Sequence, residues 1–387
     1  MRVAIITESF LPDCNGVANT VRRMADYLRR SGHHPMVIAP ALARRIADPA
    51  LDLGYPVIRA ISLPLPSYPG LRIGLPSPRI RAALIRHGSQ IVHLASPFVL
   101  GATTAATARR LGLPILAVYQ TDMPAYARAY RTGASGEAAA WRILRRIHNR
   151  ADRTLAPSRA TAAELAGHGI DRVWLWTRGV DTELFHPARR SAALRAELAP
   201  GGEVLVGYVG RLAAEKRVDL LAEVARLPGV RLVIVGTGPA REELRRVLPG
   251  AVFLGQRVGE DLAAIYASLD IFVHTGPHET FGQTLQEAAA SGLPVVAPAA
   301  GGPLDLVQDA ITGYLVPPCD AAALAAAVAR LAADPGLRAT QGHAGHAAVA
   351  DRSWLAIGEQ LVGHYRAVLA PAREPVAAVL APERAAA

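Results

Sequence analysis

Residues 204–227 read VLVGYVGRLAAEKRVDLLAEVARL. Within this stretch, Val204–Val209 is a short apolar run that predicts a buried strand, and Val218–Leu227 has the apolar spacing of a helix. A loop that contains Gly210 separates the two elements. Strands that alternate with helices of this length are typical of a parallel sheet covered by helices on both faces. The stretch therefore predicts one strand–helix unit of a doubly wound α/β domain.

The same alternation extends along the chain of 387 residues. In the second half, strands are predicted at Arg231–Val235, Ala251–Leu254, Ile271–His274 and Val295–Ala297, and helices at Ala240–Val247, Glu260–Ala267 and Gly282–Ser291. In the first half, strands are predicted at Val3–Ile6, Met36–Ala39, Val57–Ser62, Ile91–Ala95, Ile115–Tyr119 and Thr154–Ala156, and helices at Val17–Arg30, Pro78–Arg86, Gly101–Leu111, Glu137–Ala151 and Arg159–Gly167. The proline-rich stretch Pro64–Pro78 predicts a long loop outside the sheet.

The pattern is interrupted at Thr177–Pro187. We therefore expect an N-terminal Rossmann-like domain over residues 1–180 and a C-terminal one over residues 181–355. A helix over 356–370 is expected to return to the N-terminal domain, and the tail over 371–387, rich in Ala, Pro and Glu, is expected to be disordered. Because ligands of such sheets bind at the carboxyl ends of strands, the chemistry should lie in the cleft between the domains.

The composition excludes several classes of protein. Hydrophobic residues make up 51% of the chain, which excludes a disordered protein, and no apolar run approaches the ~18–20 residues that span a membrane. Cys14 and Cys319 lie far apart, which excludes a disulfide framework and a cysteine zinc site. The N-terminus lacks the apolar core of a signal peptide. We expect a cytoplasmic protein, with peripheral attachment to the inner face of the plasma membrane left open.

Charge is distributed unevenly along the chain. Of the 42 basic residues, 41 are arginine, and Lys216 is the only lysine. Genome composition explains such an arginine bias most simply. However, residues 1–184 carry 24 arginines against 12 acidic residues, whereas residues 185–387 carry 18 basic against 20 acidic residues. This asymmetry indicates that the first half faces a polyanion or an anionic membrane.

The first candidate site follows the strand Val204–Val209. Gly210 permits close approach of a ligand to the backbone, and Arg211 and Lys216 lie five residues apart in a loop that leads into a helix. A guanidinium and an ammonium in such a loop can converge on a diphosphate. A solvated surface pair is the alternative. Lysine at this one position, in a chain that uses arginine everywhere else, favours the binding site.

The second candidate site, HETFGQTLQE at residues 278–287, follows the predicted strand Ile271–His274. Glu279 lies just before the predicted helix and Glu287 in its second turn, while Gly282 leaves the free N–H groups of the first turn accessible. Two carboxylates near one helix start can accept hydrogen bonds from sugar or ribose hydroxyls. For either residue alone, helix capping or simple solvation is the alternative. The combination favours a binding site.

Further glycine turns follow other strands, at Gly236-Thr237-Gly238-Pro239, Gly255-Gln256-Arg257 and Ala300-Gly301-Gly302-Pro303. A lone Gly-x-Gly is a weak signal of nucleotide binding. No GxGxxG follows the first strand, and neither GxxxxGK[ST] nor HExxH occurs. A nicotinamide-dependent dehydrogenase is therefore disfavoured.

Together these motifs resemble the retaining glycosyltransferases of family 4, which have the GT-B architecture of two Rossmann-like domains facing a cleft. The match extends over about Met1–Tyr365, and its specific part is Gly210-Arg211…Lys216 together with Glu279-x7-Glu287. The N-terminal ESFLP at 8–12 and NGV at 15–17 also fit. Three stretches are similar to actinobacterial GDP-mannose-dependent α-mannosyltransferases, namely YQTD at 119–122, GQR at 255–257 and residues 278–287.

The resemblance implies a sugar-nucleotide donor, with GDP-mannose expected, and a role for each motif. Arg211 and Lys216 would hold the donor diphosphate and stabilise it as a leaving group, while Glu279 would bind the sugar hydroxyls. The other expected donor-binding groups are the Glu287 carboxylate at the ribose, the backbone N–H groups of Thr280, Phe281 and Gly282 beside the sugar, Gly16 and Gly210 where the backbone approaches the diphosphate, and Gly236, Gly238 and Arg257 near the base.

The resemblance also implies retention of configuration by a front-face pathway, without a covalent intermediate and without a metal or other cofactor. The sequence agrees in having no Asp-x-Asp motif. A glycosidase-like carboxylate pair is rejected, because both glutamates belong to the donor side. Cleavage of a sugar–diphosphate bond requires stabilisation of the leaving-group charge more than an acid.

The acceptor side departs from the family pattern. Several members have a histidine after the fourth strand of the N-terminal domain, where this chain has Gln120. Because glutamine cannot act as a base, Asp122 is the better candidate for that role. N-capping of the following helix is the alternative for Asp122.

Residues 141–150, WRILRRIHNR, form an arginine-rich stretch whose apolar residues share one helical face. A packed face with a solvated back is the simpler interpretation. The functional interpretation is contact with anionic lipid, which would suit a membrane glycolipid as acceptor. Pro64–Pro78 is then a candidate lining of the acceptor site.

Other functions stay open from the sequence. A UDP-sugar-dependent transferase with a small soluble or natural-product acceptor is the main alternative, and a sugar-nucleotide epimerase would share the architecture. A nucleic-acid-binding protein would suit a pI of about 10.2, but no aromatic-interleaved basic motif or zinc finger is present. We therefore expect no nucleic-acid partner.

Overall fold

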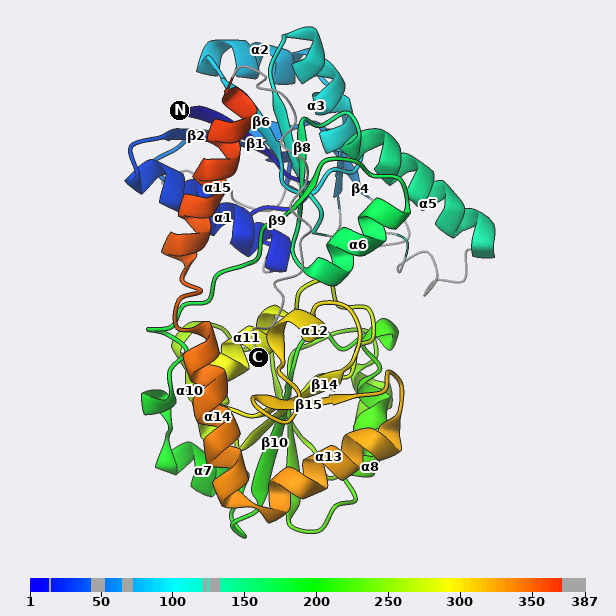
Figure 1. Ribbon diagram of the computed structural model, residues 1–387, viewed down its shortest axis with the longest axis vertical. Coiled ribbons are helices and arrows are strands. Elements are labelled where there is room, and N and C mark those ends of the chain that lie inside the picture. Colours follow the sequence, from blue (N-terminus) through cyan, green and yellow to red (C-terminus); the bar gives the residue numbers. More distant parts are fainter. Residues whose placement is uncertain (14, 43–52, 65–71, 121–123, 125–132, 371–387) are drawn as a thin grey trace, which may run out of the picture.

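A computed structural model describes the chain except for residue 14 and residues 43–52, 65–71, 121–123, 125–132 and 371–387. Two α/β domains lie one above the other in Figure 1. Each domain contains a sheet in which all strands run parallel, with helices on both faces. The expected doubly wound α/β fold is therefore confirmed.

The first domain is built on a seven-stranded sheet in the order β3-β2-β1-β6-β7-β8-β9. Its strands are β1 Arg2–Ile6, β2 His34–Pro40, β3 Val57–Ala60, β6 Ile91–Leu94, β7 Ile115–Val118, β8 Arg153–Ala156 and β9 Val173–Leu175. Its helices are α1 Gly16–Arg30, α2 Pro78–His87, α3 Val99–Arg110, α5 Gly133–His148 and α6 Arg159–Gly167. Asn15 accepts hydrogen bonds from the N–H groups of Val17 and Ala18, so it caps α1.

The second domain is built on a six-stranded sheet in the order β12-β11-β10-β13-β14-β15. Its strands are β10 Val204–Val209, β11 Val230–Val235, β12 Val252–Gly255, β13 Ile271–Val273, β14 Val295–Pro298 and β15 Gly313–Val316. Its helices are α7 Ala192–Leu198, α8 Leu221–Val224, α9 Arg241–Val247, α10 Gly259–Ser268, α11 Gln283–Ala290, α12 Pro303–Leu306, α13 Ala321–Ala333 and α14 Pro335–Val349. The one-turn 3-10 helices η2 Pro187–Arg189, η3 Ala214–Lys216 and η4 Val218–Leu220 lie in its loops.

The last helix, α15 (Trp354–Leu369), follows the second domain in sequence but packs along α1 of the first (Figure 1). A Cβ on Gly358 would lie 2.5 Å from the Tyr27 ring, so the absence of a side chain permits this contact. The Trp176 indole N–H donates to the Ile357 carbonyl at 3.0 Å. Helix α15 thus contributes to the core of the first domain.

Several elements differ from the prediction, and the helices α7, α12, α13 and α14 were not predicted. Two edge strands, β9 and β15, were not predicted; each is short and only partly buried, because an edge strand has a neighbour on one side alone. The predicted helix Val218–Leu227 is broken into η4 and the four-residue α8. The predicted strand Val57–Ser62 divides into β3 and β4 (Ser62–Pro64), and β4 pairs antiparallel with β5 (Arg72–Gly74), so part of the expected Pro64–Pro78 loop is a strand, although it lies outside the main sheet.

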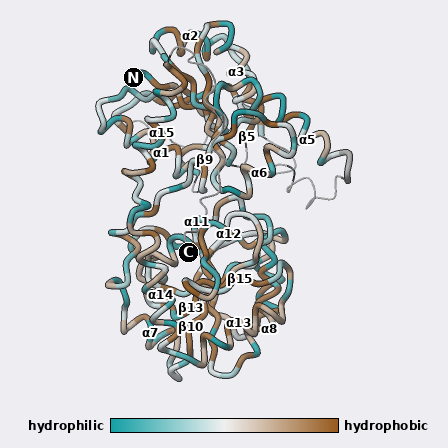
Figure 2. The backbone as a smooth tube through the Cα atoms, viewed as in Figure 1, coloured by the Kyte–Doolittle hydropathy of each residue, from teal (hydrophilic) through white to brown (hydrophobic). Residues whose placement is uncertain are grey.

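Hydrophobic colouring follows the strands of both sheets in Figure 2, and buried apolar residues of the helices join these strands in the hydrophobic cores. On α5, Trp141, Leu144 and Ile147 are buried, whereas Arg142 and Arg145 are exposed. This pattern matches the simpler interpretation of that helix, a packed face with a solvated back. Within the described part of the chain, no helix has the length and apolar content needed to cross a bilayer.

Candidate active site between the domains

The loops after the neighbouring strands β10 and β13 bring Lys216 and Glu279 together. The Lys216 Nζ donates to Glu279 Oε2 at 2.9 Å, and the two side chains are 22% and 20% exposed. The Thr275 hydroxyl donates to the Lys216 carbonyl at 2.6 Å, which ties the two loops to each other. Two residues 63 positions apart in sequence thus form one charged pair at the carboxyl ends of parallel strands.

The Glu279 carboxylate is held in its charged form. Burial acts to raise its pKa, but the Lys216 ammonium, His274 and the Phe281 N–H outweigh burial and bring the pKa down to about 2. His274 lies 3.7 Å from the same carboxylate oxygen, and burial lowers its pKa to about 4. The imidazole is therefore neutral at physiological pH, and Glu279 is an anion that can accept hydrogen bonds.

Arg211 lies on the same loop as Lys216 and forms an ion pair with Glu215. About a third of its side chain is exposed, so the guanidinium is open to a ligand. Both cations of the first candidate site thus form ion pairs with carboxylates.

Glu287 lies on α11, where its carboxylate accepts a hydrogen bond from the Tyr266 hydroxyl at 3.2 Å. Burial raises its pKa to about 7, although hydrogen bonds from Tyr266 and Gln283 act in the opposite direction. No ion pair of Glu287 is present among the described residues. Its charge is therefore poised to change near neutral pH.

The glycines of the site are required by close contacts between loops. A Cβ on Gly236 would lie 1.9 Å from the Gly210 carbonyl oxygen, and one on Gly238 would lie 2.1 Å from that of Leu212. Both have positive φ, at +134° and +159°. Gly282 also has positive φ, at +99°, and begins α11 without a side-chain cap. These glycines let the loops after β10 and β11 lie against each other.

The other predicted residues lie in several places. Thr280 points its carbonyl to the Thr161 hydroxyl of the first domain at 3.3 Å, Phe281 is buried, and Arg257 is exposed just after β12. Gln120 is buried, and its carboxamide donates to the Ala95 carbonyl at 2.6 Å. Asp122 lies outside the described residues.

Polar contacts join the two domains around this site. Arg23 pairs with Asp181 at 3.0 Å, and the N–H of Arg159 at the start of α6 donates to Asp305. Among the described residues, no group of three or more His, Cys, Asp or Glu side chains is gathered as a metal site would require. The expectation of a metal-free reaction stays a prediction.

Three polar residues of this region were not singled out from the sequence for a role. Glu8, at the end of β1, accepts from the N–H groups of Phe98 and Gly101 at the start of α3. His274 lies beside Glu279, as described above. Arg178 is buried where the domains meet. Glu8 belongs to the ESFLP stretch at 8–12, but no role was inferred for it, and His274 and Arg178 belong to no motif with fixed spacing, so only the fold shows where these side chains lie.

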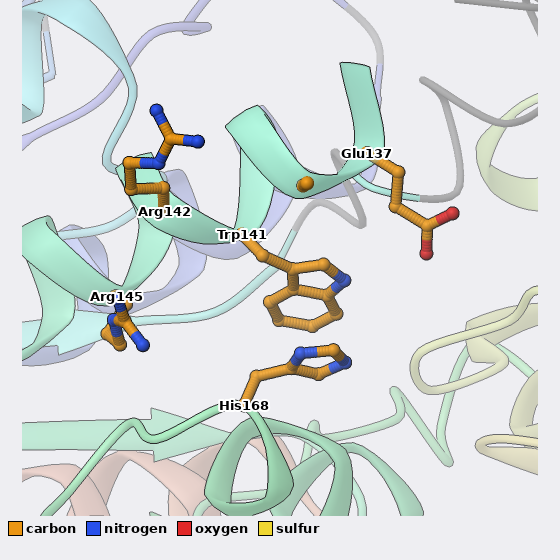
Figure 3. Close-up of a pocket in the computed structure, with 6 residues that line it drawn as sticks. Glu137, Trp141, Arg142, Arg145 and His168 are labelled. Atoms are coloured by element: carbon orange, nitrogen blue, oxygen red, sulfur yellow. The ribbon is translucent and has the colours of Figure 1, made fainter. Parts of the chain in front are cut away.

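A separate pocket of about 410 Å³ lies between α5 and the end of α6. The rings of Trp141 and His168 are stacked there, with 3.6 Å between their centroids, and Figure 3 shows Glu137 on one side and Arg142 and Arg145 on the other. None of the donor-site residues lines this pocket. The pocket lies on the first domain, and its lining includes the exposed arginines Arg142 and Arg145 of α5.

Comparison with known proteins adds independent information. The family model described as Glycosyltransferase Family 4 matches residues 14–184, and the model described as Glycosyl transferases group 1 matches residues 190–347. The GDP-mannose-dependent α-mannosyltransferase of Mycolicibacterium smegmatis is 48% identical over 376 residues, which covers 95% of this chain and 98% of the relative. The enzyme of that name from Corynebacterium glutamicum is 42% identical over 371 residues, which covers 96% and 90%.

The fold is shared with solved structures. Sucrose-phosphate synthase from Thermosynechococcus elongatus superposes with a TM-score of 0.80 at 24% identity, and the match covers 95% of this chain and 99% of the other. At this identity, the likeness speaks for the architecture alone. The expected GT-B arrangement of two Rossmann-like domains is thereby confirmed.

Proposed function

This chain belongs to glycosyltransferase family 4, together with the actinobacterial GDP-mannose-dependent α-mannosyltransferases, and on that premise we propose that it transfers mannose from GDP-mannose to an acceptor with retention of configuration. The observation that carries the proposal is the pairing of Lys216 with Glu279 at the ends of two adjacent parallel strands, with Arg211 on the same loop as Lys216. Two cations and one ionised carboxylate suit a ligand that has both phosphates and hydroxyl groups.

The chemistry assigned to these residues follows from their charges. As the bond between the sugar C1 and the β-phosphate oxygen breaks, the electron pair goes to the phosphate, and Arg211 and Lys216 stabilise the growing negative charge. Glu279 accepts hydrogen bonds from the mannose hydroxyls and fixes the orientation of the ring. The acceptor oxygen attacks C1 from the face that the phosphate leaves, so configuration is retained.

The acceptor hydroxyl must also lose its proton. Gln120 cannot take it, because a carboxamide is not a base, and its Nε2 and Oε1 already hydrogen-bond to Ala95 and Arg178. We assign the proton to the departing phosphate oxygen, which becomes more basic as the bond breaks. This assignment needs no protein base, and a role for Asp122 on the acceptor side stays a hypothesis.

Nucleotide binding to the intact protein tests the proposal. In a thermal-shift panel of GDP, UDP, ADP and their sugars, GDP and GDP-mannose are expected to raise the melting temperature most, because a ligand that binds only the folded state stabilises it. Incubation with GDP-mannose should then release GDP when an acceptor is present. A response to UDP-sugars alone would support the alternative donor. NAD is added to the same panel, and a response to NAD alone would overturn the transferase.

We further propose that the acceptor is lipid-linked and that the first domain meets an anionic membrane surface. Arg142, Arg145 and Arg146 are exposed on α5, and the exposed Ile143 lies among them. Each basic residue near an anionic surface contributes about 1 kcal/mol to binding. Because the apolar face of α5 is packed in the core, contact would be made by the arginines and Ile143.

Replacement of Arg142, Arg145 and Arg146 by Gln is expected to weaken co-sedimentation with vesicles that contain phosphatidylglycerol. Wild-type binding should fall as salt increases, because exposed charges are screened within about 8–10 Å at physiological ionic strength. The matched control replaces Arg226, Arg245 and Arg246, three exposed arginines of the second domain, by Gln. Equal sedimentation with neutral and anionic vesicles would instead favour a small soluble acceptor, without affecting the donor assignment.

A further inference from the structure

Arg178 lies in the segment that leads from β9 to the second domain, and only 8% of its surface is exposed. Its guanidinium donates to Thr20 Oγ1 at 3.3 Å and to Gln120 Oε1 at 3.0 Å. Both acceptors are uncharged. Among the residues that the structure describes, no carboxylate forms an ion pair with this guanidinium.

The guanidinium lies between the two loops that face each other across the cleft. On the first-domain side, a Cβ on Gly16 would lie 3.4 Å from an Arg178 guanidinium nitrogen. On the second-domain side, the Phe281 ring centroid is 6.0 Å from the guanidinium carbon. The Arg178 carbonyl also accepts from the Gln286 side chain of α11 at 2.9 Å. Arg178 therefore contacts the starts of both α1 and α11.

A buried cation with uncharged partners alone is energetically unfavourable, because burial removes its hydration and nothing of opposite charge replaces it. Burial lowers the pKa of Arg178 to about 10, so the group still carries its charge at neutral pH. The carboxylate of Glu279 acts on it, but that carboxylate is already paired with Lys216. Helix α11 starts at Gly282 without a side-chain cap, which adds further positive potential.

We propose that Arg178 is a further donor-binding residue, a third cation that contacts the β-phosphate of the nucleotide between Gly16 and the start of α11. The inference depends on the proposed function, because it needs a nucleoside-diphosphate donor in the cleft. The phosphate supplies the directly paired negative charge that no described carboxylate gives this guanidinium. Because Arg178 lies in the segment that joins the domains, this contact makes donor binding depend on the position of one domain relative to the other.

The test compares GDP with GMP, which lacks the β-phosphate, on Arg178→Met. Titration calorimetry should show GDP binding weakened about tenfold to a hundredfold, the usual effect of one charged hydrogen bond, and GMP binding changed much less. Arg178→Lys should restore part of the GDP affinity. Without nucleotide, the melting temperature of Arg178→Met should stay close to that of wild type, because removal of a buried charge that pairs with no described carboxylate offsets the loss of its hydrogen bonds to Thr20 and Gln120.

Arg153→Met is the matched control, because Arg153 is a partly buried arginine at the amino end of β8, away from the cleft, where it contacts His364. Its GDP affinity should equal that of wild type. Unchanged GDP affinity in Arg178→Met would overturn the inference. Equal losses of affinity for GDP and GMP, together with a lower melting temperature, would also overturn it, because they would show that Arg178 only stabilises the fold. If Arg178→Met does not fold, Arg178→Gln and Arg178→Lys are compared in the same way. If wild type itself binds no GDP, the proposed function fails rather than this inference.

Discussion

Lys216→Ala is expected to lower turnover with GDP-mannose by about tenfold to a hundredfold, and to lower it by more than it weakens GDP binding. A charge-assisted hydrogen bond contributes about 1.5–3 kcal/mol, and here it strengthens as negative charge develops on the leaving diphosphate. Arg211→Ala should show the same direction for the same reason. Steady-state rates with GDP-mannose and calorimetric affinities for GDP measure the two effects separately.

Two variants serve as controls for Lys216→Ala. Arg226→Ala removes an exposed cation of the same domain that forms an ion pair with Glu223, and it should leave turnover unchanged. Lys216→Arg keeps the positive charge but replaces the compact ammonium by a planar guanidinium. Its turnover therefore tests whether the single lysine of the chain is needed for its ammonium group. Wild-type turnover in both Lys216→Ala and Arg211→Ala would show that the two cations are merely part of the surface.

The Lys216–Glu279 pair also makes a contribution to stability that depends on pH. The folded protein lowers the pKa of Glu279 to about 2, below its ordinary value of 4.5. A lowered carboxyl pKa stabilises the fold above pH about 4.5, and this stability is lost as the pH falls through about 2. Lys216→Ala should therefore be less stable than wild type near neutral pH, with the difference shrinking as the pH falls toward 2.

The fold was predictable because it depends on repeated local patterns. Apolar runs such as Val204–Val209 and Val295–Ala297 are strands buried over all or nearly all of their length, and each was predicted within a residue of its observed bounds. The misses have local causes. Strand β9 is only three residues long and lies at a sheet edge. The predicted helix Val218–Leu227 is broken into η4 and α8, and Pro228 follows its last residue directly. At these positions, the extent of burial and the presence of a proline determine the secondary structure more than the apolar periodicity does.

The site was predictable where its residues form motifs with fixed spacing. Arg211 and Lys216 share one loop, and Glu279 and Glu287 flank one helix start, so their chemistry could be inferred without coordinates. The contact of Lys216 with Glu279 could not, because it depends on the pairing of β10 with β13. Arg178 was missed for the same reason: a lone arginine between strand and domain boundary becomes significant only when the fold buries it.

Replacement of Glu287 and replacement of Glu279 are expected to have different effects on nucleotide binding. Glu287→Ala should weaken binding of free GDP by about tenfold to a hundredfold, because a carboxylate that accepts from ribose hydroxyls acts on GDP itself. Glu279→Ala should spare GDP and lower the affinity for GDP-mannose, because its partner is the sugar. Tyr266→Phe, which removes the hydroxyl that donates to Glu287, is the control for indirect effects. Equal losses of GDP affinity in both alanine variants would contradict the assignment.

The ionisation of Glu287 with pH gives a second test of its assignment, through the stability of the folded protein. Its pKa is raised to about 7 by burial, whereas the unfolded value is 4.5. A raised carboxyl pKa contributes stability that is fully present below pH about 4.5 and is lost as the pH rises through about 7. Glu287→Gln without nucleotide should therefore be at least as stable as wild type at pH 8.

With nucleotide, Glu287→Gln should behave in the opposite way. The carboxylate form is the better acceptor for ribose hydroxyls, so wild-type affinity for GDP should rise between pH 6 and 8. Glu287→Gln should lose the part of this rise that exceeds the titration of GDP itself, which a pH series on both proteins isolates. A parallel rise in the two proteins would place Glu287 away from the ribose, and would leave Tyr266 and Glu287 as a structural hydrogen bond of α11.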